Sequence, residues 1–229
     1  MSTGTQRRRP VILVTGFGPF PGAPRNASSD LAEELARVAL RQLPGYRVQA
    51  AILPTEWHEG PRQLGLLLDE HDPVVAVHFG VSRRAKGFVI EMRARNEAGQ
   101  VCDATGAMPP GTCVAYQGPA ELAALMPTAL IVARLRRLGL PVQASRDAGT
   151  YLCNAVLYST LADARRRAAA GLRRGFVHLP DRLAPADARM SGTSRRAVPS
   201  QLDWDGAVTG GLAILAACVG ANERAMALG

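Results

Sequence analysis

The chain has 229 residues, 47% of them apolar, which fits a single α/β domain with a core of normal size. No apolar run reaches the roughly 20 residues that cross a bilayer, and the polar, basic N-terminus does not resemble a secretory signal, so we expect a cytoplasmic protein without membrane contact. The formal net charge is +8, but the arginines form short scattered runs without interleaved aromatic residues, which argues against nucleic-acid binding.

The elements of the first half alternate between strand and helix. Residues 1–9 are predicted to form a disordered basic arm, and residues 10–229 a single domain. The apolar, β-branched runs predict strands at 11–14, 46–53, 74–79 and 87–92. Helices are predicted at about 30–42, capped by Ser28 or Ser29, and at 56–70.

The second half continues the alternation after an irregular stretch. Residues 97–118 are rich in Gly and Pro and predict no regular element. A long helix is expected at 119–138 with Gly139 at its C-terminus, then a strand at 142–144, a helix at about 152–170, a strand at 175–179, a polar loop at 180–199 and a final helix at about 200–226. This order predicts an α/β fold in which helices cover both faces of a mostly parallel, mixed sheet.

The four cysteines show neither a metal-binding nor a disulfide pattern. Cys102, Cys113, Cys153 and Cys218 form no CxxC pair, and the neighbouring histidines do not complete a zinc spacing. Cys153 differs from the others because it follows a strand and a Gly-containing turn and lies at the start of a helix. Free N–H groups and the helix dipole at that position stabilise a thiolate and can form an oxyanion hole. The alternative is a cysteine that packs as a small buried hydrophobe.

Two further side chains could complete a catalytic group. His178 ends the strand at 175–179, where a base can reach a nucleophile on a neighbouring helix, although it could equally be a core histidine. His78, near the end of the strand at 74–79, is its main competitor. Glu91 ends the strand at 87–92 and could orient an imidazole, or could face water on an edge strand.

The Gly-rich segment after the first strand, Gly16–Gly22, lacks the spacing of a phosphate-binding loop, and its two prolines remove amide donors. We therefore exclude nucleotide binding there. Phe17 and Phe20 could instead line a small apolar pocket, unless they pack onto the core as loop residues.

Four segments together resemble the pyroglutamyl peptidase I family, the pyrrolidone-carboxyl peptidases. They are VTGFGPFPG at 14–22 followed by Asn26, IEMRARN at 90–96, DAGTYLCN at 147–154 and GFVHLP at 175–180. Their order and approximate spacing also match, and the resemblance covers about residues 10–226. Outside the nucleophile segment the chain departs from the family pattern, for instance at Gly18, Pro21, Ala27 and Met92, after Asn96 and across 80–84.

The resemblance implies an open three-layer α/β/α sandwich and a cysteine peptidase that removes N-terminal pyroglutamyl groups from peptides. Carried over by position, Cys153 is the nucleophile, His178 the base and Glu91 its orienting carboxylate. The substrate-binding residues are assigned to Phe17, Phe20, Asn26 and Gly80.

The resemblance also implies no metal or organic cofactor, a small peptide with a blocked N-terminus as the partner, and a cytosolic homo-oligomer, either a dimer or a tetramer. Two alternatives stay open. One is a cysteine hydrolase of another small N-acyl or cyclic amide, and the other is a non-catalytic binding protein on the same scaffold.

Overall fold

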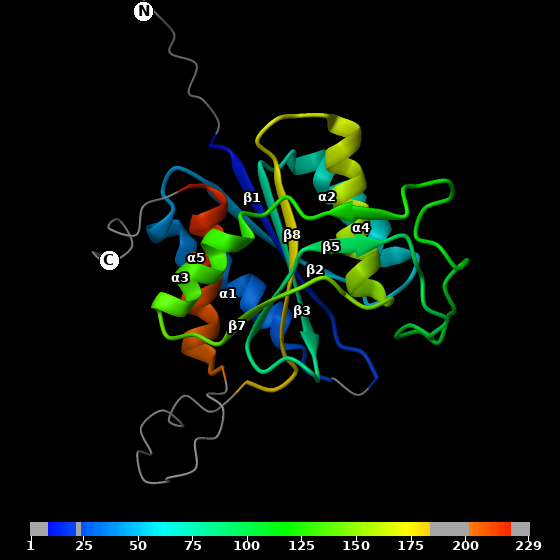
Figure 1. The fold of residues 1–229 in the computed structure, drawn as a ribbon, viewed down its shortest axis with the longest axis horizontal. Coiled ribbons are helices and arrows are strands. Elements are labelled where there is room, and N and C mark those ends of the chain that lie inside the picture. The colour runs from blue at the N-terminus through cyan, green and yellow to red at the C-terminus, as the bar shows by residue number, and fades with distance from the viewer. Residues whose placement is uncertain (1–8, 22–23, 184–201, 221–229) are drawn as a thin grey trace, which may run out of the picture.

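A computed structural model describes residues 9–21, 24–183 and 202–220, and shows a twisted sheet between two layers of helices (Figure 1). The sheet has six strands in the order β2-β1-β3-β8-β4-β7, and a separate two-stranded sheet joins β5 and β6. The strands are β1 Val11–Phe17, β2 Arg47–Leu53, β3 Val75–Ser82, β4 Phe88–Glu91, β5 Arg93–Arg95, β6 Glu121–Ala123, β7 Val142–Ser145 and β8 Arg173–Pro180.

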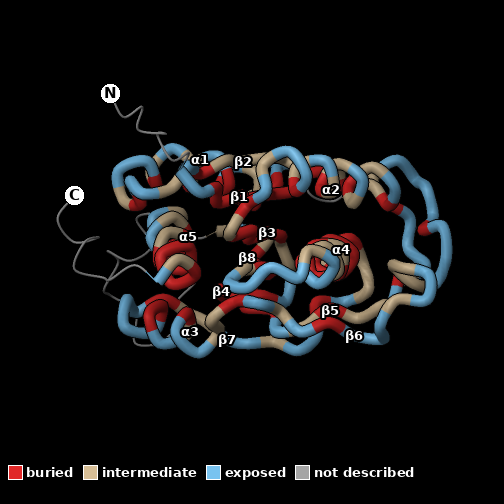
Figure 2. Tube along the Cα trace, turned by 90° about the horizontal axis from the view of Figure 1, so that it is seen from above, coloured by how far each residue is buried: buried red, intermediate tan, exposed pale blue. Residues whose placement is uncertain are grey.

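Five helices cover the two faces of this sheet in the described part of the chain. They are α1 Ala27–Gln42, α2 Glu59–His71, α3 Thr128–Arg137, α4 Leu152–Arg167 and α5 Trp204–Cys218. Helices α1, α3 and α5 lie on one face, and α2 and α4 lie on the other together with β5 and β6 (Figure 2). The predicted α/β/α sandwich is therefore confirmed. No helix in the described ranges combines the length and apolar character needed to cross a bilayer.

Two apolar clusters, one on each face, follow from the alternation of side chains along the strands. Val75, Val77 and Phe79 of β3 pack into the cluster beneath α1, α3 and α5. Ala76 of β3 and Phe176 of β8 pack into the cluster beneath α2 and α4. Because successive side chains of a strand point to opposite faces, the even-numbered residues of β3 and β8 all face α2 and α4.

The direction of the strands changes beside β8. Strands β1, β2, β3 and β8 are parallel, whereas β4 pairs antiparallel with β8 and parallel with β7. Val89 lies opposite His178, and Glu91 lies opposite Phe176. Since Phe88 and Ile90 pack into the cluster on the other face, Glu91 points to the same face as His178.

The predicted helix at 119–138 is wrong in its first half. Residues 121–123 form β6, which pairs antiparallel with β5, and α3 begins at Thr128 after Pro127. The Ala, Leu and Glu residues of this segment favour a helix locally, but pairing with β5 overrides that preference. Proline also disfavours helical backbone in the residue before it, which separates 121–126 from α3.

Several predicted boundaries also shift. Helix α1 begins at Ala27, and its cap is Asn26, not Ser28 or Ser29, because the Asn26 side chain accepts from the Ser28 N–H. Gly139 follows α3 with a φ of 70°, as expected of a residue that ends a helix. Residues 1–8 of the predicted arm, 184–199 of the predicted loop and 221–226 of the predicted last helix lie outside the described residues.

Candidate active site

The nucleophile candidate, Cys153, is the second residue of α4. Gly149 adopts a φ of 79° in the turn before the helix, a conformation that glycine adopts without strain. Tyr151 occupies the N-cap position with extended backbone and provides no side-chain cap. The first N–H groups of a helix have no partner within it, so those of Leu152 and Cys153 are free to bind an anion beside the sulfur.

A side chain next to the nucleophile fixes the start of α4. Asn154 is 1% exposed, and its carboxamide donates to the carbonyls of Arg95 (2.8 Å) and Glu97 (2.9 Å). It also accepts the N–H of Arg95 at 2.9 Å. The chain runs from Glu91 at the end of β4 through β5 to residue 97, so these three bonds hold α4 against the segment that follows Glu91. Asn154 ends the DAGTYLCN segment at 147–154, but the sequence predicted no role for it.

His178 and Glu91 form a buried pair. Nδ1 of His178 lies 2.8 Å from Oε1 of Glu91, and the two side chains are 11% and 1% exposed. An ionised carboxylate only accepts hydrogen bonds, so Nδ1 carries a proton and Nε2 is left to face the sulfur. The ring of Phe176 packs against His178 with a centroid distance of 4.9 Å.

The charges of the site favour protonation of the imidazole. Burial would lower the pKa of His178, but the Cys153 thiolate, through its charge and a hydrogen bond, and then the Glu91 carboxylate outweigh burial and raise that pKa to about 10. An imidazolium beside the sulfur stabilises the thiolate, which is the reactive form of a cysteine. The three side chains can therefore act together as an activated nucleophile and its acid-base partner.

Two cavities meet at Cys153. We call the first the aromatic cavity; it has a volume of about 240 Å³ and is lined by Phe17, Phe20, Asn26, Thr55, Val81, Arg83, Tyr151, Leu152 and Cys153. The second, the histidine cavity, has about 450 Å³ and is lined among others by Arg83, Arg84, Glu91, Asp147, Cys153 and His178. The two cavities share Val81, Arg83, Tyr151 and Cys153 in their linings, so a ligand that reaches from one into the other would lie next to Cys153.

The residues assigned to the substrate site take different positions. Phe17, which is buried, and the partly exposed Phe20 line the aromatic cavity. Asn26 lines it too, but its amide bonds the Gly18 carbonyl at 3.1 Å and its oxygen accepts from Ser28. Gly80 lies beneath the nucleophile, where a Cβ atom would come within 3.2 Å of the Cys153 sulfur and 2.7 Å of Phe176 Cζ. Tyr151 and Arg83, which the sequence did not single out, line both cavities.

The competing histidine, His78, lies deeper in the sheet. It is completely buried and shares a 2.8 Å hydrogen bond with Thr15 Oγ1. Burial, helped by the nearby Arg174 guanidinium, lowers the pKa of His78 to about 3 and keeps the ring neutral. His78 lines neither cavity at Cys153.

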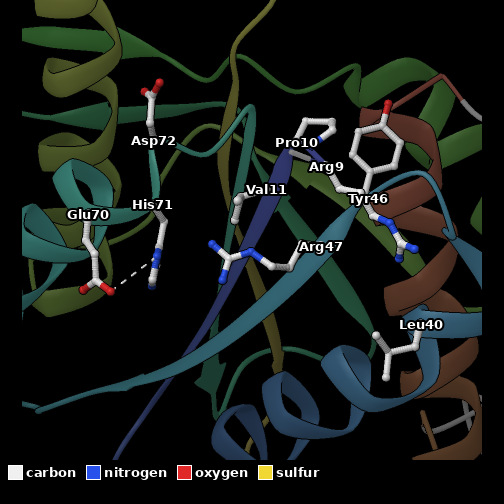
Figure 3. A pocket seen from close by; sticks show the side chains of 9 residues that line it. All are labelled: Arg9, Pro10, Val11, Leu40, Tyr46, Arg47, Glu70, His71 and Asp72. Carbon is white, nitrogen blue, oxygen red and sulfur yellow. Dashed lines mark ion pairs between the residues drawn. The ribbon is translucent and has the colours of Figure 1, made fainter. Parts of the chain in front are cut away.

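A larger cavity, of about 640 Å³, lies away from Cys153 at the amino ends of β1 and β2 (Figure 3). Its wall contains Arg9, Arg47 and Asp72, and a pair between His71 and Glu70 at 3.7 Å, but no cysteine, serine or threonine. This wall offers no nucleophile for acyl transfer. In the described residues, no three His, Cys, Asp or Glu side chains gather as metal ligands would.

Comparison with known proteins agrees with this geometry. The family model described as pyroglutamyl peptidase matches residues 10–210. Pyroglutamyl-peptidase 1 of Mus musculus is 30% identical over 199 residues, which are 86% of this chain and 91% of that protein. Pyrrolidone-carboxylate peptidase of Chromobacterium violaceum is 36% identical over 171 residues, 74% of this chain and 77% of that protein.

A solved structure gives the same fold. The crystal structure of Bacillus amyloliquefaciens pyroglutamyl peptidase I superposes with a TM-score of 0.76 at 25% identity, covering 92% of this chain and 97% of that one. The match of the family model to most of the chain, together with these relatives, settles the family. The chain belongs to the pyroglutamyl peptidase family of cysteine peptidases.

Proposed function

We propose that this protein hydrolyses the amide bond after an N-terminal pyroglutamyl group, with Cys153 as nucleophile, His178 as acid and base, and Glu91 as the residue that orients His178. The observation that carries the proposal is the meeting of the two cavities at Cys153, beside the His178–Glu91 pair. The names of the relatives, pyroglutamyl-peptidase and pyrrolidone-carboxylate peptidase, support the choice of substrate.

The reaction starts from the ion pair in which the thiol proton of Cys153 has already moved to His178. The thiolate attacks the acyl carbonyl, a C–S bond forms, and the oxygen takes up negative charge facing the N–H groups at the start of α4. His178 then gives its proton to the nitrogen as the C–N bond breaks, and the shortened peptide leaves. Water, losing a proton to His178, hydrolyses the thioester and releases pyroglutamate and the free thiol.

The aromatic cavity is suited to the acyl half of this substrate. A five-membered lactam has two flat apolar faces and a polar edge, and the cavity provides two phenylalanines for the apolar faces. The Thr55 hydroxyl and the Asn26 amide line the same cavity, and each already donates to the Gly18 carbonyl at 3.1 Å. A lactam that is buried between the rings would place its carbonyl carbon over the sulfur. The leaving amine would then lie on the side of His178, within the histidine cavity.

The assay measures release of 7-amino-4-methylcoumarin from its pyroglutamyl, prolyl and acetyl-alanyl amides. We expect selective hydrolysis of the pyroglutamyl compound and a loss of at least about a thousandfold in Cys153→Ala. Cys113→Ala is the matched control, since Cys113 is a partly exposed free cysteine that lines neither cavity, and it should retain activity. Preference for another amide would indicate a different cysteine hydrolase, and failure to cleave any amide would indicate a binding protein.

A further inference from the structure

Two arginines stand on the rim of the active site, at the carboxyl end of β3. Arg83 lines both the aromatic and the histidine cavity, and Arg84 lines the histidine cavity. The Arg83 side chain is 78% exposed. The two charges lie outside the four segments that carry the resemblance to the family, at 14–22, 90–96, 147–154 and 175–180.

The acidic side chains around the histidine cavity already have partners. Glu91 is bonded to His178, and the carboxylate of Asp147 accepts from Arg95 Nη2 at 2.9 Å and from the Gly149 N–H at 3.1 Å. Among the described residues, neither rim arginine has a carboxylate partner as close as these. Asp181 lies 3.9 Å from Arg83 Nε, at the limit of an ion pair, and no carboxylate within the described ranges pairs with Arg84.

The position of the rim determines which part of a substrate it would contact. His178 has to protonate the leaving amine, so the residue after the cleaved bond lies in the histidine cavity. Arg84 lines that cavity, and Arg83 lines both that cavity and the aromatic cavity in which the acyl group would lie. A guanidinium binds a carboxylate through two parallel hydrogen bonds, which makes a carboxylate on the leaving residue the matching ligand.

We propose that Arg83 and Arg84 select substrates that carry a carboxylate on the first residue of the leaving peptide. This inference rests on the proposed function and gives it a substrate class. The carboxylate can come from the side chain of Asp or Glu, or from the α-carboxylate of a pyroglutamyl dipeptide. Because the rim is exposed to solvent, we expect a preference of about fivefold in kcat/KM, the size of a good exposed ion pair.

Four substrates separate the two sources of the carboxylate. The side chain is tested by comparing pyroglutamyl-Glu-NH₂, which carries a free side-chain carboxylate, with the uncharged pyroglutamyl-Gln-NH₂. Pyroglutamyl-Ala with a free carboxylate, compared with pyroglutamyl-Ala-NH₂, tests the α-carboxylate. We expect the charged member of at least one pair to be favoured about fivefold at low salt, and this ratio to shrink at about 0.5 M sodium chloride.

The double variant Arg83→Gln with Arg84→Gln should bring the ratio close to one. Arg136→Gln with Arg137→Gln is the control, because it removes the same charge from α3 on the opposite face of the sheet. An equal fall of the ratio in the control would assign the effect to net charge and overturn the inference. Equal kcat/KM for charged and uncharged partners would overturn it while leaving the proposed function intact, and hydrolysis of none of the four would overturn both.

Discussion

Nδ1 of His178 and Oε1 of Glu91 lie 2.8 Å apart although the two residues come from strands that run in opposite directions. Glu91 is opposite Phe176, two residues before His178 on β8, so the carboxylate reaches the ring diagonally across the antiparallel pair. The other carboxylate oxygen, Oε2, is buried and has no partner in the described part of the chain. The carboxylate of Glu91 is thus placed to orient one imidazole.

The substitution Glu91→Gln should therefore impair the function of His178 as acid and base while leaving its imidazole ring in the site. A neutral amide can donate as well as accept, so it no longer fixes the proton on Nδ1, and loss of the carboxylate charge lowers the pKa of His178 from its raised value of about 10. We expect kcat to fall by roughly a hundredfold to ten-thousandfold. Steady-state kinetics and NMR titration of His178 measure the two effects.

Glu70→Gln is the matched control for this substitution. Glu70 lies in α2, its side chain is 71% exposed, and it lines the large cavity at the other end of the sheet. We expect kcat and the pKa of His178 to stay at their wild-type values in this variant. An unchanged kcat in Glu91→Gln would contradict the role proposed for the carboxylate.

The reactivity of Cys153 toward iodoacetamide should reveal its ionic partner. With the pKa of His178 raised to about 10, the ring stays protonated at neutral pH, and a cation beside the sulfur favours the thiolate over the thiol. We expect alkylation of Cys153 at about pH 6 to be faster than that of the exposed Cys102, with mass spectrometry of peptides as the readout. Glu91→Gln should reduce this advantage, and equal labelling of both cysteines at about pH 6 would refute the ion pair.

Much of this site was predictable because its chemistry lies at the ends of elements. Cys153 follows a turn and starts a helix, and His178 lies near the end of a run of apolar residues, so the pattern made both of them candidates while a structural role stayed open for each. The direction of β4 was not evident, since Glu91 reaches His178 across an antiparallel pair and not from a shared edge of parallel strands. Local sequence does not determine how distant strands pair.

The pairing of β5 with β6 shows the same limit. Ala94 faces Leu122 across nearly thirty residues of mostly irregular chain, and the Ala-rich segment around Leu122 has a pattern that favours a helix. Asn154 bonds Arg95 of this small sheet, so the role of Asn154 could not be inferred before the position of β5 was known. Arg83 and Tyr151 likewise gained significance only when the cavities were defined.

The two phenylalanines of the aromatic cavity should respond differently to truncation. Phe20 is partly exposed, so Phe20→Ala should cost little stability but raise KM for a pyroglutamyl substrate about tenfold as the ring contact is lost. Phe17 is 3% exposed and packs near Phe176 at a centroid distance of 6.2 Å. Phe17→Ala should lower the free energy of unfolding by about 3–5 kcal/mol. Denaturant unfolding and kinetics on both variants check this, and an unchanged KM in Phe20→Ala would remove Phe20 from the substrate site.

At Gly80, the addition of a single methyl group should lower the catalytic rate. A Cβ atom there would lie 2.7 Å from Phe176 Cζ and 3.2 Å from the Cys153 sulfur, and Phe176 in turn packs against the ring of His178. The added methyl group has to push the ring or the sulfur away. We expect Gly80→Ala to lower kcat by at least about tenfold and the free energy of unfolding by roughly 1–3 kcal/mol.

Gly65→Ala is the control that separates crowding from a general effect of replacing glycine. A Cβ at Gly65 meets nothing within 4 Å, and the residue lies within α2, so alanine should raise the free energy of unfolding by about 0.5–1 kcal/mol and leave kcat unchanged. Thermal unfolding and steady-state kinetics of the two variants give the comparison. If Gly80→Ala kept full kcat, the close approach of β3 to the Cys153 sulfur would have no part in positioning the nucleophile.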